Sequence, residues 1–249
     1  LRDTRFIALD RETGALRWQK DLGNPVLASP IVVDGTVFIG STNNELYALD
    51  AATGRERWTF STQGWIVSPV AYADGVVAVT SQDGLLHIVD AGTGRQRFVY
   101  DAGWPIMGGP AIHGDRVYFV SKRGTVWSVD RNGRTYPFER AWRTISFNLY
   151  AWGLITSISV QKGTLWVKNI GGRPGFSPAI AHDTVYVANT EGEVIALDAD
   201  TGEERWVTDL ALDITSDLIV AGNTVLLGAG DGILYGLDAS TGEELWTFE

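Results

Sequence analysis

The stretch LDAATGRERW, from Leu49 to Trp58, contains the pattern that decides the fold. An apolar residue and Asp are followed by a short polar turn that ends in Gly, and an aromatic residue stands eight positions after the Asp. Closely similar copies begin at Leu9, Leu197 and Leu237. The Asp residues lie 40 residues apart at positions 10, 50, 90 and 130, and again at positions 198 and 238. This period is typical of the four-stranded blades of a β-propeller.

One repeat can be divided into four short strands, which we name A to D in chain order. Within residues 26–60 the runs VLASPIVV, TVFIGS, ELYALD and ERWTF are rich in β-branched and aromatic residues. Asp34-Gly35, Asn43-Asn44 and Thr53-Gly54 separate them and supply the positive φ of tight hairpins. The same turns recur downstream, so the repeats predict strands and no helix.

The repeated Asp and aromatic residues are predicted to be structural. An Asp carboxylate can accept N–H groups of the turn that follows it, and an aromatic ring can fill the wedge between neighbouring blades. Calcium binding by these turns is not expected, because each turn offers too few oxygen ligands. This predicted docking motif comprises Asp10, Trp18, Asp50, Trp58, Asp90, Phe98, Asp198, Trp206, Asp238 and Trp246.

The number of blades is predicted from the aromatic residues assigned to strand D. The series runs Trp18, Trp58, Phe98, Phe138, Trp166, Trp206 and Trp246, which indicates seven blades. The first blade is expected to be incomplete, because the chain opens with strands C and D. Either a further A–B pair lies outside this sequence, or the ring stays open at a sheet edge.

The gap between Phe138 and Trp166 is 28 residues, and residues 139–165 are therefore interpreted as a degenerate fifth blade. Three alternatives stay open for this segment. It could be a damaged blade, an exposed apolar hairpin that contacts a partner or a membrane surface, or the flanks of a missing loop. A six-bladed ring follows if residues 139–176 form no blade, and an eight-bladed ring would need one more.

Composition limits the classes of function. The chain has 249 residues, 45% of them hydrophobic, and is expected to form a single all-β domain over residues 1–249. Its net charge of −10 and the lack of a basic stripe argue against nucleic acid as a partner. It has no Cys, and no run of 18 apolar residues predicts a transmembrane segment. The three His residues show no metal-binding spacing, so no catalytic residue, metal or cofactor is assigned.

Aromatic residues between strand D of one blade and strand A of the next form a candidate surface for a protein partner or a ligand. All D-to-A connections of a propeller emerge on one face around the channel mouth. The rings could form an arc there and anchor an interface, or each could pack over its own blade edge. The candidates are Trp65, Trp104, Trp142 and Phe176.

The order Asp-x-x-Thr-Gly-x-x-x-Trp, Ser-Pro, Asp-Gly and LYALD resembles the repeat of pyrroloquinoline quinone (PQQ) enzymes over almost the whole chain. It is most similar to non-catalytic PQQ-like propellers, such as BamB-type outer-membrane assembly lipoproteins and the sensor domains of bacterial Ser/Thr kinases. PQQ dehydrogenases resemble it less, because they are longer and carry insertions that hold the quinone, calcium and an Asp base. Many also place a vicinal disulfide over the quinone, which a chain without Cys cannot form.

The resemblance implies a non-enzymatic scaffold that binds a protein partner outside the cytoplasm of a bacterium. The alternative is a ligand-sensing propeller within a larger protein, with a small molecule at the channel mouth. A PQQ-dependent dehydrogenase is the third and least supported function.

Overall fold

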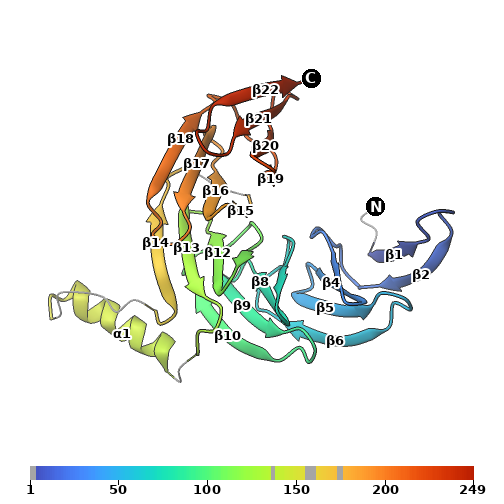
Figure 1. Ribbon diagram of the computed structural model, residues 1–249. Helices are drawn as coiled ribbons and strands as arrows, with labels where there is room; N and C mark the ends of the chain where they lie inside the picture. The colour runs from blue at the N-terminus through green and yellow to red at the C-terminus, as the bar shows by residue number, and fades with distance from the viewer. Residues whose placement is uncertain (1–3, 136–137, 155–160, 173–175) are drawn as a thin grey trace.

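The computed structural model describes residues 4–135, 138–154, 161–172 and 176–249. These residues form five four-stranded antiparallel sheets, one two-stranded sheet and helix α1 (Glu139–Ala151). The sheets follow one another side by side as the blades of an open arc, and the first and last blades do not meet (Figure 1). The predicted all-β propeller architecture of four-stranded antiparallel blades is confirmed.

We number the blades 1 to 6 along the chain. Blade 1 contains β1 (Arg5–Leu9) and β2 (Leu16–Asp21), and blade 2 contains β3 (Ile31–Val33), β4 (Thr36–Gly40), β5 (Glu45–Asp50) and β6 (Glu56–Ser61). Blade 3 contains β7 (Ala71–Ala73), β8 (Val76–Thr80), β9 (Leu85–Asp90) and β10 (Gln96–Asp101). Blade 4 contains β11 (Ala111–His113), β12 (Arg116–Val120), β13 (Thr125–Asp130) and β14 (Thr164–Asn169). Blade 5 contains β15 (Ala179–Ala181), β16 (Thr184–Ala188), β17 (Glu193–Asp198) and β18 (Glu204–Asp209). Blade 6 contains β19 (Ile219–Ala221), β20 (Thr224–Gly228), β21 (Leu234–Asp238) and β22 (Glu244–Phe248).

The hydrophobic core consists of layers between neighbouring blades, because strand side chains alternate between the two faces of each sheet. On β5, Tyr47 and Leu49 pack in the layer shared with blade 1. Leu46 and Ala48 pack in the layer shared with blade 3. Each inner strand therefore contributes to two layers, which explains its continuous apolar sequence.

The interpretation of residues 139–165 as a fifth blade is wrong. Strand D of blade 4 is β14, where Trp166 lies opposite Ser128 just as Trp58 lies opposite Ala48 in blade 2. Residues 131–163 are an insertion between strands C and D of this blade, and they contain α1, which the repeat pattern did not predict. Phe138 precedes α1 and does not belong to a strand D. The count of seven blades is not confirmed, because the described residues form six sheets.

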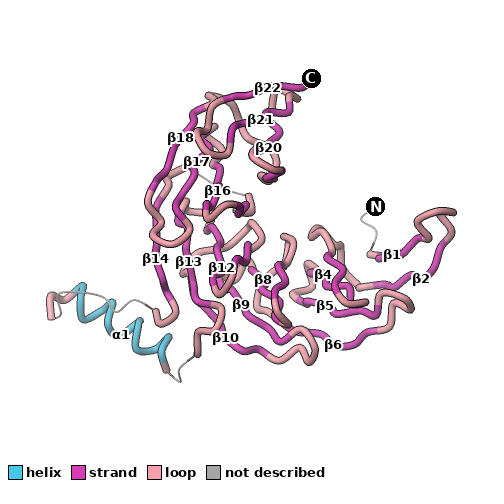
Figure 2. The backbone as a smooth tube through the Cα atoms, viewed as in Figure 1, coloured by secondary structure: helices cyan, strands magenta, loops and turns pink. Residues whose placement is uncertain are grey.

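The insertion is attached to the outer strand of blade 3 while its helix stands away from the sheets (Figure 2). The Val99 N–H of β10 donates to Thr135 Oγ1 at 3.1 Å. On the returning side, Gln161 Nε2 donates to the Val99 carbonyl at 3.2 Å, and its Oε1 accepts the Asp101 N–H at 2.9 Å. These three hydrogen bonds fix both ends of the insertion on one strand.

Candidate interaction surface

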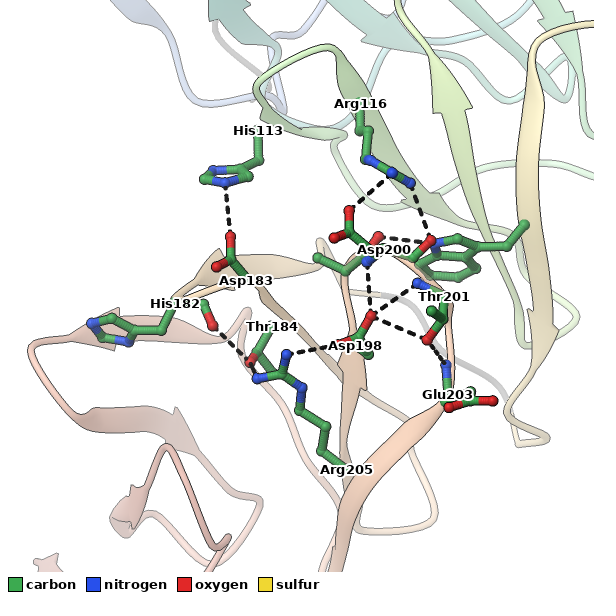
Figure 3. Close-up of polar contacts among 12 residues, drawn as sticks. His113, Arg116, His182, Asp183, Thr184, Asp198, Asp200, Thr201, Glu203 and Arg205 are labelled. Atoms are coloured by element: carbon green, nitrogen blue, oxygen red, sulfur yellow. Dashed lines mark hydrogen bonds and ion pairs between the residues drawn. The ribbon is translucent and has the colours of Figure 1, made fainter.

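The Asp of each repeat organises the turn between strands C and D. In blade 5, Asp198 Oδ1 accepts the N–H groups of Asp200 at 3.0 Å and Thr201 at 2.9 Å, together with the Thr201 hydroxyl (Figure 3). Its Oδ2 accepts a hydrogen bond from Arg205 at 2.7 Å. Asp10, Asp50, Asp90 and Asp238 also accept N–H groups of the turns that follow them.

These contacts keep the carboxylates ionised. The pKa is lowered to about 2 at Asp50, Asp90 and Asp198. The main cause is the hydrogen bond from the Arg seven residues later, and the hydrogen bonds from the Thr of the turn come second. A hydrogen bond from the Thr13 N–H lowers the pKa of Asp10, and one from the Ser240 hydroxyl lowers that of Asp238. Carboxylates with such low pKa values are weak general bases at neutral pH, so their geometry supports a structural role.

The aromatic residue of strand D packs on the turn of the following blade. Trp58 Nε1 donates to the Ala91 carbonyl at 2.9 Å, and its ring covers Gly94. Trp18, Trp166 and Trp206 make the same hydrogen bond to the Ala residues at positions 51, 199 and 239. Phe98 packs in the same way against Gly133 and Gly163, although it has no N–H to donate.

At each end of the arc one partner of the contact between a Trp ring and a Gly turn is absent among the described residues. In blade 6 the Trp246 ring is 41% exposed and covers no turn of a later blade. In blade 1 a Cβ added to Gly14 would meet nothing within 4 Å among the described residues. The outward side of blade 6 also has a mainly apolar pocket of about 510 Å³, to which Ile219, Leu226 and Leu234 contribute.

Trp65 and Trp104 lie in the D-to-A connections after blades 2 and 3. Their side chains are 50% and 43% exposed. The Trp65 carbonyl accepts the Gln82 N–H at 3.0 Å, which fixes this connection to the B-to-C turn of blade 3. The Arg123 guanidinium carbon lies 3.4 Å from the centre of the Trp104 ring, a cation–π contact that holds the ring in place. Two successive blades thus expose one Trp each on a supported backbone.

The other two predicted surface residues, Phe176 and Trp142, do not lie beside Trp65 and Trp104 as exposed rings. Phe176 lies in the connection after blade 4, but its ring is partly buried against the core layer of blades 5 and 6. The placement of Trp142 after a strand D is wrong, because it lies on α1 between strands C and D of blade 4. The C-to-D turns are at the opposite end of the strands from the D-to-A connections, so Trp142 cannot join the predicted arc.

A second exposed apolar group surrounds Trp142. It comprises Phe138, Trp142, Ile145, Trp152 and Leu154, all on or next to α1. The repeat pattern does not reveal this group, because Phe138 occupies the position of a strand D aromatic residue, eight residues after Asp130. The spacing of 4, 3, 4 and 3 residues through positions 138, 142, 145, 149 and 152 was the signal that could have revealed it.

His87 and His113 each have a polar partner. His87 is buried and its Nδ1 lies 3.0 Å from Gln96 Oε1, while His113 pairs with Asp183 at 3.4 Å (Figure 3). Across the described residues no group of three His, Asp or Glu side chains is arranged to hold a metal. A polar pocket of about 130 Å³ near His182 and Arg205 lies on the A-to-B face, away from Trp65. It is smaller than the roughly 300–1,000 Å³ typical of small-molecule sites.

The repeat geometry, with its Asp turn and docked Trp, agrees with the comparison with known families. The sequence pattern of the family described as "Outer membrane protein assembly factor BamB" matches residues 2–64, 62–144 and 151–249. The chain belongs to this BamB family. The predicted resemblance to PQQ-like, BamB-type propellers is confirmed.

A curated relative is the outer membrane protein assembly factor BamB of Burkholderia pseudomallei (strain K96243), 28% identical over 112 residues. This match spans 39% of the chain and only 28% of the relative's length. Within the described residues, no helix is long and apolar enough to cross a membrane.

Solved structures with similar folds include BamB from Moraxella catarrhalis, with a TM-score of 0.71 and 19% identity, covering 99% of this chain and 73% of that one. Quinohemoprotein alcohol dehydrogenase from Comamonas testosteroni has a TM-score of 0.66 and 21% identity, and the match covers 91% of this chain and 43% of the dehydrogenase chain. The computationally designed protein Ika8 has a TM-score of 0.69 and 17% identity, and the match covers 99% of this chain and 81% of Ika8. At these identities the likeness shows the fold alone, so an enzyme, an assembly factor and a designed protein share it.

Proposed function

We propose that this BamB-family chain is a non-enzymatic scaffold of the bacterial envelope and that it binds a protein partner through Trp65 and Trp104. The observation that carries the proposal is the exposure of these two rings on one face of successive blades. Trp is the residue type most enriched among interface hot spots. The family match, which includes all six blades, supports a role in outer membrane protein assembly outside the cytoplasm.

The rigidity of the two connections supports a preformed binding surface. The hydrogen bond from Gln82 restricts the backbone at Trp65, and the Arg123 contact restricts the Trp104 ring, so part of the entropy cost of ordering this surface is already met before a partner binds. A ligand-sensing role has weaker support, because the polar pocket is small and lies on the other face, and the pocket of about 510 Å³ on blade 6 offers little polar surface to orient a ligand. Catalysis by the repeated carboxylates has weaker support as well, because Asp50, Asp90 and Asp198 are ionised and bonded to their own turns.

The test is photo-crosslinking in a bacterial envelope extract, with a photoreactive residue placed at position 65 or 104. A partner identified at both positions is then purified, and its affinity is measured for the unmodified chain and for a Trp65→Ala, Trp104→Ala variant. We expect the variant to bind about 30-fold or more weakly, which corresponds to a loss of about 2 kcal/mol at a hot spot.

The matched control is a Trp142→Ala, Trp152→Ala variant, which removes two exposed rings from another part of the molecule. It is expected to keep the affinity of the unmodified chain. Equal affinity of the Trp65→Ala, Trp104→Ala variant and the unmodified chain would refute this surface. Dye reduction after addition of quinone and calcium would refute the non-enzymatic role.

A further inference from the structure

Helix α1 presents an apolar stripe to solvent. Trp142, Ile145, Leu149 and Trp152 follow one another at spacings of 3, 4 and 3 residues, which places them on one side of an α-helix. Trp142 is 59% exposed and Trp152 is 72% exposed, and Phe138 at the N-terminal end of the stripe is 85% exposed. On the helices of globular proteins such a stripe normally faces the protein core. Here it faces water.

Among the described residues, the exposed side chains Trp142, Ile145 and Trp152 of this stripe are left largely uncovered. Of the described strands, none packs extensively along α1, and Figure 1 shows the helix extending outward from the blades. A helix of about 13 residues is marginally stable in water without a surface against which it can pack. The hydrogen bonds of Thr135 and Gln161 to β10 hold both ends of the insertion, and Glu139 at the start of α1 accepts the Lys162 N–H at 2.9 Å, so the helix is attached through the flanks of the insertion.

The charge of the insertion is opposite to that of the rest of the chain. Residues 134–162 contain four cations, Arg134, Arg140, Arg143 and Lys162, and one anion, Glu139, for a net charge of +3. Because the whole chain carries −10, the other residues together carry −13. A local excess of cations beside Trp and other large apolar residues is the composition of helices that lie in the interface of anionic membranes.

We propose that α1 is a membrane-surface element that lies in the plane of an anionic lipid layer, with Trp142 and Trp152 inserted between the headgroups. Its length of 13 residues is too short to span a bilayer. At physiological salt the Debye length is about 8 Å, so the negative charge of the more distant blades is largely screened and does not prevent the insertion from approaching the lipid. This contact goes beyond the proposed protein-binding role and uses a different end of the strands, so lipid and a partner could be bound together.

The experiment measures co-sedimentation of the whole chain with vesicles of phosphatidylcholine alone and with vesicles that also contain phosphatidylglycerol. We expect binding to the anionic vesicles, weakening with added salt, and a blue shift of Trp fluorescence. The Trp142→Ala, Trp152→Ala variant is expected to bind about tenfold or more weakly, because each lost ring removes apolar area from the lipid contact. The matched Trp65→Ala, Trp104→Ala variant is expected to bind vesicles like the unmodified chain.

Urea unfolding of both variants checks that the blades remain intact. No binding to anionic vesicles would overturn the proposal, as would equal binding by the two variants or equal binding to vesicles without phosphatidylglycerol. A protein that crosslinks to α1 through Trp142 and Trp152, with no vesicle binding, would also overturn it and would identify a protein as the occupant. None of these results depends on whether Trp65 and Trp104 bind a partner.

Discussion

Replacement of Gly202 by Ala tests the contact between blades most directly. Gly202 has a φ of +74°, and a Cβ added there would lie 2.7 Å from Trp166 Cδ2 and Cε3. Gly75, in the A-to-B turn of blade 3, has a φ of +75°, and an added Cβ would meet no described residue within 4 Å. The two glycines therefore share the backbone conformation and differ in the presence of a docked ring.

The expected loss of stability can be separated into two parts. An Ala residue in the left-handed region costs about 1–2 kcal/mol at either position. At position 202 the methyl group must also displace Trp166, which is buried, and overpacking of this kind costs about 1–3 kcal/mol more. Gly75→Ala is expected to cost about 1–2 kcal/mol, and Gly202→Ala about 2–5 kcal/mol.

Urea unfolding followed by Trp fluorescence and circular dichroism measures both variants. Asn tolerates the left-handed conformation, so Gly75→Asn is expected to be nearly neutral, whereas Gly202→Asn keeps the steric cost. If Gly202→Ala and Gly75→Ala lower the free energy of unfolding equally, within about 0.5 kcal/mol, then close packing of Trp166 on Gly202 does not stabilise the contact between blades 4 and 5.

Three further predictions follow from individual contacts. The carboxylates of Asp50, Asp90 and Asp198 have a pKa of about 2 in the folded chain, below the unfolded value of about 3.9. They should therefore stabilise the fold above pH 4, and this contribution should be lost as the pH falls through about 2. Urea unfolding at several pH values measures the loss. Trp58→Phe should lower stability by about 1 kcal/mol by removing one hydrogen bond, and Trp206→Phe should cost less in the same assay, because its acceptor carbonyl keeps the Tyr186 hydroxyl as a donor. Arg123→Gln should lower stability by less than about 1 kcal/mol and make the Trp104 ring more accessible to acrylamide quenching; unchanged quenching would contradict the cation–π contact.

The fold could be predicted from the sequence because each blade repeats the same local chemistry. Asp50, Thr53 and Gly54 define a turn without any information from distant residues, and the 40-residue period then implies neighbouring blades. The strands of blades 2 and 3 lie where their apolar runs end at such turns. Local hydrogen bonds and tertiary packing agree in these segments, so the sequence pattern is reliable there.

The insertion in blade 4 could not be predicted in the same way. Phe138 stands eight residues after Asp130 and so matches the repeat by position. The residue that pairs with strand C is Trp166, and a separation of 36 residues from Asp130 hides this pairing from a search by period. The exposure of Trp65 and Trp104 could not be predicted from the sequence either. Spacing assigns a residue to a connection but does not determine which atoms cover its ring.

The contact between a Trp of one blade and a Gly turn of the next gives the arc a polarity. Blade 6 presents the uncovered ring of Trp246, and blade 1 presents the uncovered turn at Gly14. Two blade 6 ends placed together would offer two rings and no left-handed turn to receive them. A contact between blade ends that uses this pairing therefore joins two different surfaces and is heterologous. A surface that covers Trp246 as the inner blades cover their Trp rings must supply a turn with Gly at the position of Gly14. The direction in which blades follow one another is therefore set by the Trp ring on one side of each contact and by the Gly without a side chain on the other.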